Sequence, residues 1–362
     1  MSSDPPLGIT VAVCTYRRPE LLAGTLRSLV RQDYPTGYFE IIVIDNNSPE
    51  DDTRQVVHAF KDAPIAPRYL RETRQGLSHA RNRAVGESRR EIVVFADDDI
   101  STDHEWLGKL VAPFRGPGGQ QIAAIGGEVV PVYPEGVEVA VLIHQPLRLR
   151  ATAGPLRAGQ IPMGANLAFR RAALIEAGLF DPRAGRHGSR LFGGDENRLI
   201  ERLARRRHQI WFVPEARVFH HLPRERSGLR YALQHGFDSA CSRVLTHTVA
   251  LKERNASPAA YLVSRLGANL AKTIVCGLFG ALWMTLGLPS IAAPQLVRAA
   301  RALGYVQQTT RMLGAGPRRL WLLLARSTTP TGPANLPSDE KPEIRPRWEG
   351  SRTSSAIAPR TG

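Results

Sequence analysis

Short apolar runs alternate with helical patterns between residues 8 and 132, and this alternation restricts the chain to few folds. The runs ITVAVCTY (9–16), EIIVIDNNS (40–48) and EIVVFA (91–96) each hold a continuous apolar stretch, typical of strands buried on both faces of a parallel sheet. A weaker strand, RYL, follows the second run. Helical patterns separate or follow these strands, at residues 17–35, 51–60, 76–88 and 104–114. We therefore predict an α/β fold with a mostly parallel central sheet and helices on both faces.

The pattern changes after about residue 122. The segments AIGGEVVPVY, NLAFR, IWFVP and RVFHH are typical of short strands, and AALIEAG and ENRLIERLARR of helices. Residues 225–255 are expected to form one or two amphipathic helices. In the first part of the chain, Ser78 is the expected N-cap of the helix at 76–88.

Three consecutive carboxylates, Asp97, Asp98 and Asp99, directly follow the run EIVVFA. Like charges this close repel and raise one another's pKa, so the cluster needs compensation. Ligands of parallel sheets bind beyond the carboxyl ends of the strands, where Thr15 and Asp45 also fall. A hard divalent cation, Mg²⁺ or Mn²⁺, would neutralise the carboxylates. The alternative is a solvated turn that caps the next helix.

The formal net charge of +15 favours an anionic partner, which can be nucleic acid, a phosphate-bearing substrate or an anionic membrane surface. The chain has no C2H2, RNP or basic-zipper pattern, so we expect no nucleic acid. Three scattered cysteines without metal-ligand spacing indicate a reducing compartment. The beginning of the sequence, MSSDPPLG, predicts no secretory signal.

Six blocks of the sequence resemble, in order, those of the family 2 glycosyltransferases. The blocks are VAVCTYRRPELLAGTLRSLVRQDYP, EIIVIDNNSPEDD, GLSHARNRAVGESRREIVVFADDDI, IPMGANLAFRR, GGDENRLIERL and VPEARVFHH, and together they cover residues 8–222. The family consists of inverting enzymes with the GT-A nucleotide-diphospho-sugar transferase fold. The resemblance implies a GT-A catalytic domain at residues 1–224.

The resemblance also implies which residues bind the nucleotide sugar. Thr15 and its neighbours would line the base and ribose, although Arg17 stands where the family usually has Asn. Asp45 would bind the pyrimidine or ribose, and Arg81 would approach the base or diphosphate. From the residues alone, the alternative for Asp45 is an ordinary turn aspartate, and the alternative for Arg81 is a solvated helix residue.

The three aspartates match the D-x-D motif of the family. The match makes Asp97 and Asp99 metal ligands for Mn²⁺ or Mg²⁺, and it places Asp97 and Asp98 on the nucleotide-sugar side. His220 matches a histidine that completes the metal shell in some members, and the adjacent His221 leaves its assignment open.

The family resemblance places the catalytic base in the block GGDEN. The family usually has Glu-Asp there, whereas this chain has Asp195-Glu196. We favour Glu196 as the base, with Asp195 as the alternative if the loop shifts by one residue, and both are also typical first-turn acids of a helix. Gly164 and Asn166 match a segment that lines the sugar and the acceptor.

These assignments imply inverting transfer from a nucleotide-diphosphate sugar to an acceptor hydroxyl, in cell-envelope glycan or glycolipid synthesis. The acceptor would be a carbohydrate or a lipid-linked molecule. The alternative is a catalytically inactive nucleotide-sugar-binding or scaffold protein on the same fold. No glycine-rich loop follows the first strand, which argues against a sugar nucleotidyltransferase or an NAD-binding protein. GGDEN resembles the GGDEF of diguanylate cyclases only superficially, because a helical pattern starts at once.

The C-terminal third is predicted to be a helical region at 225–326 and a disordered tail at 327–362 that is rich in Pro, Ser, Thr and Gly. Residues 273–297 carry no charge and are long enough to cross about 30 Å of hydrocarbon, so they are a candidate transmembrane or re-entrant segment. A buried helical hairpin is the alternative. The arginines that follow place the catalytic domain at the cytoplasmic face of the membrane, on anionic lipid; they are Arg298, Arg301, Arg311, Arg318 and Arg319.

Overall fold

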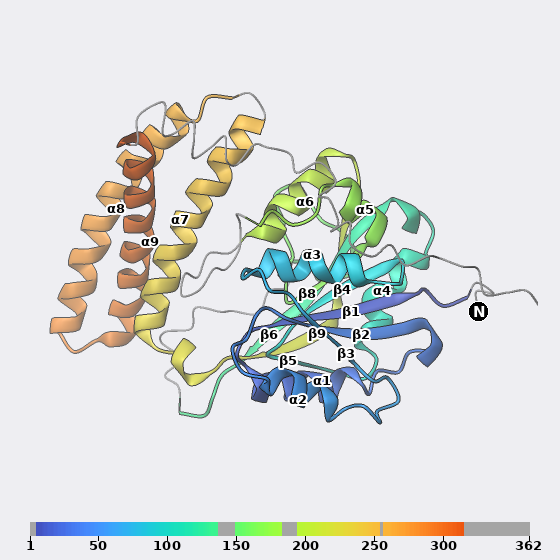
Figure 1. Cartoon of the computed structure of the whole chain (residues 1–362). Coiled ribbons are helices and arrows are strands. Elements are labelled where there is room, and N and C mark those ends of the chain that lie inside the picture. The colour runs from blue at the N-terminus through green and yellow to red at the C-terminus, as the bar shows by residue number, and fades with distance from the viewer. Residues whose placement is uncertain (1–4, 137–148, 183–193, 254–255, 315–362) are drawn as a thin grey trace, which may run out of the picture. The chain divides into compact units, whose positions relative to one another are not determined.

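We describe a computed structural model of the chain, which defines residues 5–136, 149–182, 194–253 and 256–314 (Figure 1). Among these residues, nine strands form one sheet in the order β3-β2-β1-β4-β8-β6-β9-β5, and β7 pairs with β9. The strands are β1 (Ile9–Thr15), β2 (Phe39–Asp45), β3 (Arg68–Arg71), β4 (Ile92–Asp97), β5 (Ile100–Thr102), β6 (Ile122–Val132), β7 (Gly154–Pro155), β8 (Asn166–Arg170) and β9 (Gln209–His221).

The first four strands of the sheet order are parallel, as the alternating pattern predicts. β1 lies between β2 and β4, with Thr15 opposite Asp45 and Cys14 opposite Asp97. β8 runs antiparallel to both β4 and β6, and the sheet is therefore mixed. This register confirms that the ends of β1, β2 and β4 share one edge, where the polar residues of the sequence gather.

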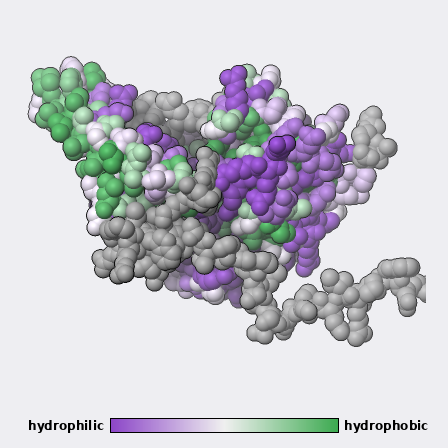
Figure 2. All heavy atoms as spheres, turned by 90° about the horizontal axis from the view of Figure 1, so that it is seen from above, coloured by the Kyte–Doolittle hydropathy of each residue, from purple (hydrophilic) through white to green (hydrophobic). Residues whose placement is uncertain are grey.

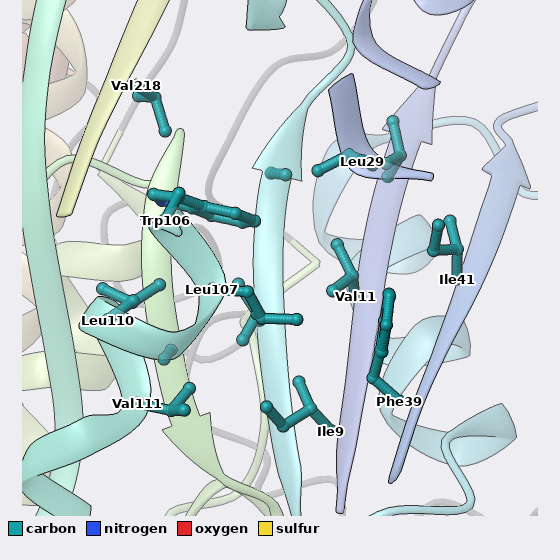
Figure 3. Close-up of a cluster of buried hydrophobic side chains, with 14 of the residues drawn as sticks. Ile9, Val11, Leu29, Phe39, Ile41, Trp106, Leu107, Leu110, Val111 and Val218 are labelled. Carbon is teal, nitrogen blue, oxygen red and sulfur yellow. The ribbon is translucent and has the colours of Figure 1, made fainter. Parts of the chain in front are cut away.

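Helices cover both faces of the sheet. They are α1 (Pro19–Leu29), α2 (Asp52–His58), α3 (Leu77–Glu87), α4 (Trp106–Val111), α5 (Arg171–Glu176) and α6 (Asp195–Arg205). One buried cluster joins α1, α2 and α4 to Ile9, Val11 and Val13 of β1 (Figure 3), and a second joins α3, α5 and α6 to Ala12 and β2. Because successive β1 side chains enter different clusters, both faces must be apolar.

Two details differ from the sequence prediction. Gly76, not Ser78, is the N-cap of α3, because its φ of 135° is open to glycine and not to serine. The two strands expected from IWFVP and RVFHH are one strand, β9. Its register to β6 jumps from Gly127↔Val213 to Glu128↔Arg217, so three residues around Pro214 bulge out and the strand continues past the proline.

The C-terminal helices are α7 (Leu229–Glu253), α8 (Ala259–Thr285) and α9 (Pro289–Gly314), after a short 3₁₀ turn, η5 (Arg224–Arg226). The uncharged stretch 273–297 is not one helix, because the chain reverses at Gly287, whose φ is 71°. Within the described residues, one helix, Ala259–Thr285, is long and apolar enough to cross a membrane. The described helices α8 and α9 form a hairpin, but most of α8 is exposed, so the alternative of a buried hairpin does not hold. A spanning or re-entrant segment stays a prediction. The predicted tail at 327–362 lies outside the described residues.

Candidate functional site

The aspartate cluster forms the turn between β4 and β5. β5 pairs antiparallel with β9, with Ile100 opposite His220. This pairing brings two segments about 120 residues apart together, and His220 Nε2 lies 2.9 Å from Asp99 Oδ1. The antiparallel pairing of β5 with β9 therefore brings a histidine that is distant in sequence next to the aspartates.

Asp97, Asp99 and His220 offer ligand atoms that all lie within 4.8 Å of one another. Two carboxylate oxygens and an imidazole nitrogen form a donor set that suits Mn²⁺, while Mg²⁺ more often takes oxygen alone. Asp99 is buried, whereas the side chain of Asp97 is 37% exposed and faces solvent. The three residues therefore fit a divalent cation that is held by the largely buried Asp99 and His220 and reached from the side of Asp97.

Asp98 turns away from this group. Its carboxylate accepts hydrogen bonds from the hydroxyl of Thr15 at 2.7 Å and from Arg18 at 3.0 Å. Burial raises the pKa of Asp98 to about 6, and the charge of Asp99 adds to the effect while Arg18 opposes it. Thr15 is itself buried, and its hydroxyl is used by Asp98, so its side chain supports the aspartate turn.

Two arginines that the sequence analysis missed contact Asp99. Arg18 Nη1 lies 3.1 Å and Arg226 Nη1 3.3 Å from Asp99 Oδ2. Arg18 directly precedes α1, and Arg226 ends the turn η5 after β9. Their positive charge offsets the repulsion among the three carboxylates. Only the position of Arg18 beside the CTYR block could have drawn attention to it, and Arg226 has no local signal.

Arg81 of α3 links the aspartate turn to the acids of α6. Its guanidinium lies 2.8 Å from Asp195 Oδ2, 3.6 Å from Glu196 Oε2 and 3.9 Å from Asp97 Oδ1. The group is buried against the rings of Phe95 and Phe180, and the three acids keep its pKa above the ordinary value despite that burial. The alternative that Arg81 is a solvated helix residue is therefore wrong.

The two acids in the first turn of α6 have different environments. Asp195 is buried at 2% exposure and is paired with Arg81, while the Glu196 side chain is 19% exposed. Burial, reinforced by the charge of Asp195, raises the pKa of Glu196 to about 8. Burial alone would raise the pKa of Asp195 too, but Arg81 and the hydrogen bond with Glu196 hold it below its ordinary value. The two carboxyl groups are therefore shifted in opposite directions, with the pKa of Glu196 raised and that of Asp195 lowered.

The remaining residues expected near the nucleotide, Asp45 and Arg17, lie at the same edge of the sheet and contact other groups there. Asp45 is buried; it accepts the backbone N–H of Ser48 and the hydroxyl of Tyr69, both at 2.9 Å. Its side chain therefore stabilises the turn after β2, as an ordinary turn aspartate does. Arg17 has a φ of 55° and an exposed side chain 3.8 Å from Glu50. Their contacts with a nucleotide stay predictions.

Gly164 and Asn166 have structural roles next to the site. A Cβ atom at Gly164 would lie 2.6 Å from Arg81 Nη2, so the glycine makes room for the guanidinium. Asn166 is fully buried and donates both amide hydrogens to the carbonyls of Glu128 and Ala216, at 3.0 and 2.8 Å, while Trp106 Nε1 donates to its Oδ1 at 3.0 Å. The structure places the Asn166 side chain inside the sheet; the predicted acceptor contact of this segment stays a prediction.

Residues 10–176 match the sequence model of glycosyl transferase family 2. The glycosyltransferase AglE of Haloferax volcanii is 31% identical over 137 residues, which are 38% of this chain and 43% of AglE. The succinoglycan biosynthesis protein ExoM of Rhizobium meliloti is 28% identical over 236 residues, 64% of this chain and 73% of ExoM. The match therefore spans less than half of the first relative and about three quarters of the second.

The fold is shared with the mannosyltransferase PcManGT from Pyrobaculum calidifontis, solved in complex with GDP-Man and Mn²⁺. The superposition has a TM-score of 0.51 and covers 89% of this chain and 79% of PcManGT, at 19% sequence identity. The likeness confirms the predicted nucleotide-sugar transferase fold.

Proposed function

We propose that this chain is an inverting glycosyltransferase that moves a sugar from a nucleotide-diphosphate sugar to an acceptor hydroxyl. Its residues 10–176 match the model of glycosyl transferase family 2. One observation carries the proposal. A group suited to a divalent cation (Asp97, Asp99, His220) and a protonatable pair of acids (Asp195, Glu196) are joined by a single buried arginine. Such a transfer needs charge stabilisation on the leaving group and a base on the acceptor.

On the leaving-group side, Asp97, Asp99 and His220 would hold Mn²⁺ or Mg²⁺, and a bound cation would supply Lewis-acid stabilisation of the diphosphate. Arg18 and Arg226 lie within reach of the same carboxylate oxygen of Asp99. Guanidinium groups bind phosphate oxygens through paired hydrogen bonds, so both arginines are placed to hold the donor diphosphate.

On the acceptor side, Glu196 accepts the proton of the attacking hydroxyl. The new bond forms between the acceptor oxygen and the anomeric carbon, while the bond from that carbon to the diphosphate oxygen breaks on the opposite face, which inverts the configuration. Glu196 is the more exposed acid, and Asp195 is held by Arg81, so Asp195 positions the pair and Glu196 transfers the proton.

The substrates are proposed from the relatives. PcManGT was solved with a nucleotide sugar, which supports a nucleotide-sugar donor here. ExoM is a succinoglycan biosynthesis protein, which supports a carbohydrate or lipid-linked acceptor in cell-envelope glycan synthesis. We place the catalytic domain at the cytoplasmic face of the cell membrane, where nucleotide sugars are made. The presence of Asp97 and Asp99 together with the acids at 195–196 argues against an inactive binding protein.

The test is a screen of UDP-, GDP- and dTDP-sugars for donor hydrolysis and transfer, with and without Mn²⁺. We expect one donor class to be turned over by the wild-type chain with Mn²⁺ and to bind without turnover when Glu196 is replaced by Gln. Binding of nucleotide sugars by the wild type with no turnover of any of them would favour the inactive binding protein.

A further inference from the structure

Helix α8 is apolar around most of its circumference but is covered on one side only. That side faces α9: a Cβ atom at the buried Gly280 would lie 2.6 Å from Leu296 Cδ2. Seven large apolar side chains of α8 are 51–67% exposed, and they are Val263, Leu270, Ile274, Val275, Leu278, Phe279 and Leu282. Figure 2 shows hydrophobic residues gathered on the left, where these helices lie. A helix that is hydrophobic all round is normally buried, so this face has an apolar partner.

The exposed apolar surface continues around the turn into α9. Met284, Leu286, Leu288 and Ile291 are all exposed, and Gly287 reverses the chain between the helices. Residues 273–297, which we call the apolar hairpin, contain no charged residue and no histidine. Both ends of the apolar hairpin therefore lie on the same side of its tip.

The length of the arms decides how deep the hairpin can reach. The uncharged part of α8, residues 273–285, is about 20 Å long at 1.5 Å per residue. A spanning helix needs about 20 apolar residues to cross about 30 Å of hydrocarbon, and one leaflet is about half of that. Helix α8 as a whole has the length and hydropathy of a membrane span, but Arg265 lies in its first half and Lys272 at its middle. The uncharged arm that follows them is shorter than a span and long enough for one leaflet.

Basic residues surround the base of the apolar hairpin. Exposed cations precede it on α8, at Arg265 and Lys272, and follow it on α9, at Arg298 and Arg301. We call these four residues the basic collar. Lysine and arginine at the edge of an inserted segment bind anionic lipid headgroups. A second copy of the chain would bring the same positive collar and a net charge of +15 towards it, which disfavours self-association through this face.

We propose that the apolar hairpin inserts into one leaflet of an anionic bilayer as a re-entrant loop, with the basic collar at the headgroups. The chain would be attached to one side of the membrane without crossing it. This inference rests on the surface of α8 and α9 and is independent of the proposed transferase activity, so either can fail alone.

Vesicle flotation of the full chain tests the attachment. The vesicles contain about three parts phosphatidylcholine to one part phosphatidylglycerol. We expect the wild type to float and the Leu278→Glu/Leu282→Glu variant to lose most of its bound fraction, about tenfold or more, because two charges would enter hydrocarbon. Ile175→Glu on α5 is the control, since Ile175 is 49% exposed outside the hairpin, and it should float like the wild type. A wild type that stays at the bottom of the gradient overturns the proposal.

Proteinase K added outside the same vesicles tests the topology. A re-entrant hairpin should leave a protected fragment of about 25–30 residues that contains the apolar hairpin, as judged by mass spectrometry. Protection that extends from residue 273 to the C-terminus would show a spanning helix, and complete digestion would show surface binding; each result contradicts the proposal. A chain that does not float, and that forms a lipid-free dimer which the Leu278→Glu/Leu282→Glu variant dissociates, would also contradict the proposal.

Discussion

At the scale of single residues, the proposed chemistry depends on the ionisation of Glu196, because only its carboxylate form can accept the proton of the acceptor hydroxyl. The pKa of Glu196, raised to about 8 by burial and by the charge of Asp195, gives a testable pH dependence. A general base works only when ionised, so kcat/KM should rise about tenfold per pH unit below pH 8 and level off above it. Asp195→Asn removes a charge that raises this pKa, so the midpoint should move to lower pH.

The measurement is kcat/KM between about pH 6 and about pH 10 for the wild type and Asp195→Asn. A midpoint at the same pH in both proteins would contradict the coupling between the two acids. A profile that is flat in the wild type would remove Glu196 as the titrating base.

Arg226 gives a second residue-scale prediction. Arg226→Ala should weaken the binding of the nucleoside diphosphate by roughly tenfold or more, because a guanidinium placed to bind phosphate is lost. Arg224→Ala is the matched control: Arg224 lies in the same turn, but its side chain is exposed and donates to the Glu135 carbonyl. Titration calorimetry in the presence of Mn²⁺ measures the affinity of each variant for the nucleoside diphosphate of the donor that the screen identifies. Equal affinities in the two variants would show that Arg226 only balances the charge of Asp99.

At the scale of secondary-structure elements, the buried strands and their helices could be predicted because hydrophobic periodicity reports burial directly. The full length of β9 could not be predicted, because a proline such as Pro214 normally ends a strand. Here the bulge opposite β6 lets the strand continue. The aspartate turn was found because three charges after an apolar run are unusual. Arg18 and Arg226 were missed because arginines at exposed-looking positions are common, and only the sheet pairing brings them to Asp99.

Asn166 shows where motif matching fails at this scale, because its side chain connects β8 to β6, β9 and α4. Asn166→Ala would leave the buried Trp106 N–H and two backbone carbonyls without these partners, at a cost of about 1–3 kcal/mol for each buried group. We expect the free energy of unfolding to fall by about 3 kcal/mol or more in urea denaturation. Unchanged stability with a raised KM for the acceptor would instead assign Asn166 to the acceptor pocket.

At the scale of the whole molecule, the metal group is expected to act on the diphosphate of the donor, and the acid pair on the hydroxyl of the acceptor. Removal of the metal tests the first part. Chelation with EDTA should abolish transfer, and Mn²⁺ should restore it, because Asp97, Asp99 and His220 have the donor atoms for this cation. Full turnover in EDTA, with metal content checked by mass spectrometry, would contradict the metal-dependent mechanism.

The central claim is that Glu196 removes the proton of the acceptor, and the most direct measurement compares transfer rate with donor affinity in Glu196→Gln. The variant keeps the shape of the side chain but cannot accept a proton, so the rate should fall by about 10²–10⁴ while donor affinity changes little. Glu201→Gln, the same change at an exposed position of α6, should keep the wild-type rate. If Glu196→Gln transfers sugar at the wild-type rate, the base lies elsewhere and the proposed mechanism is wrong.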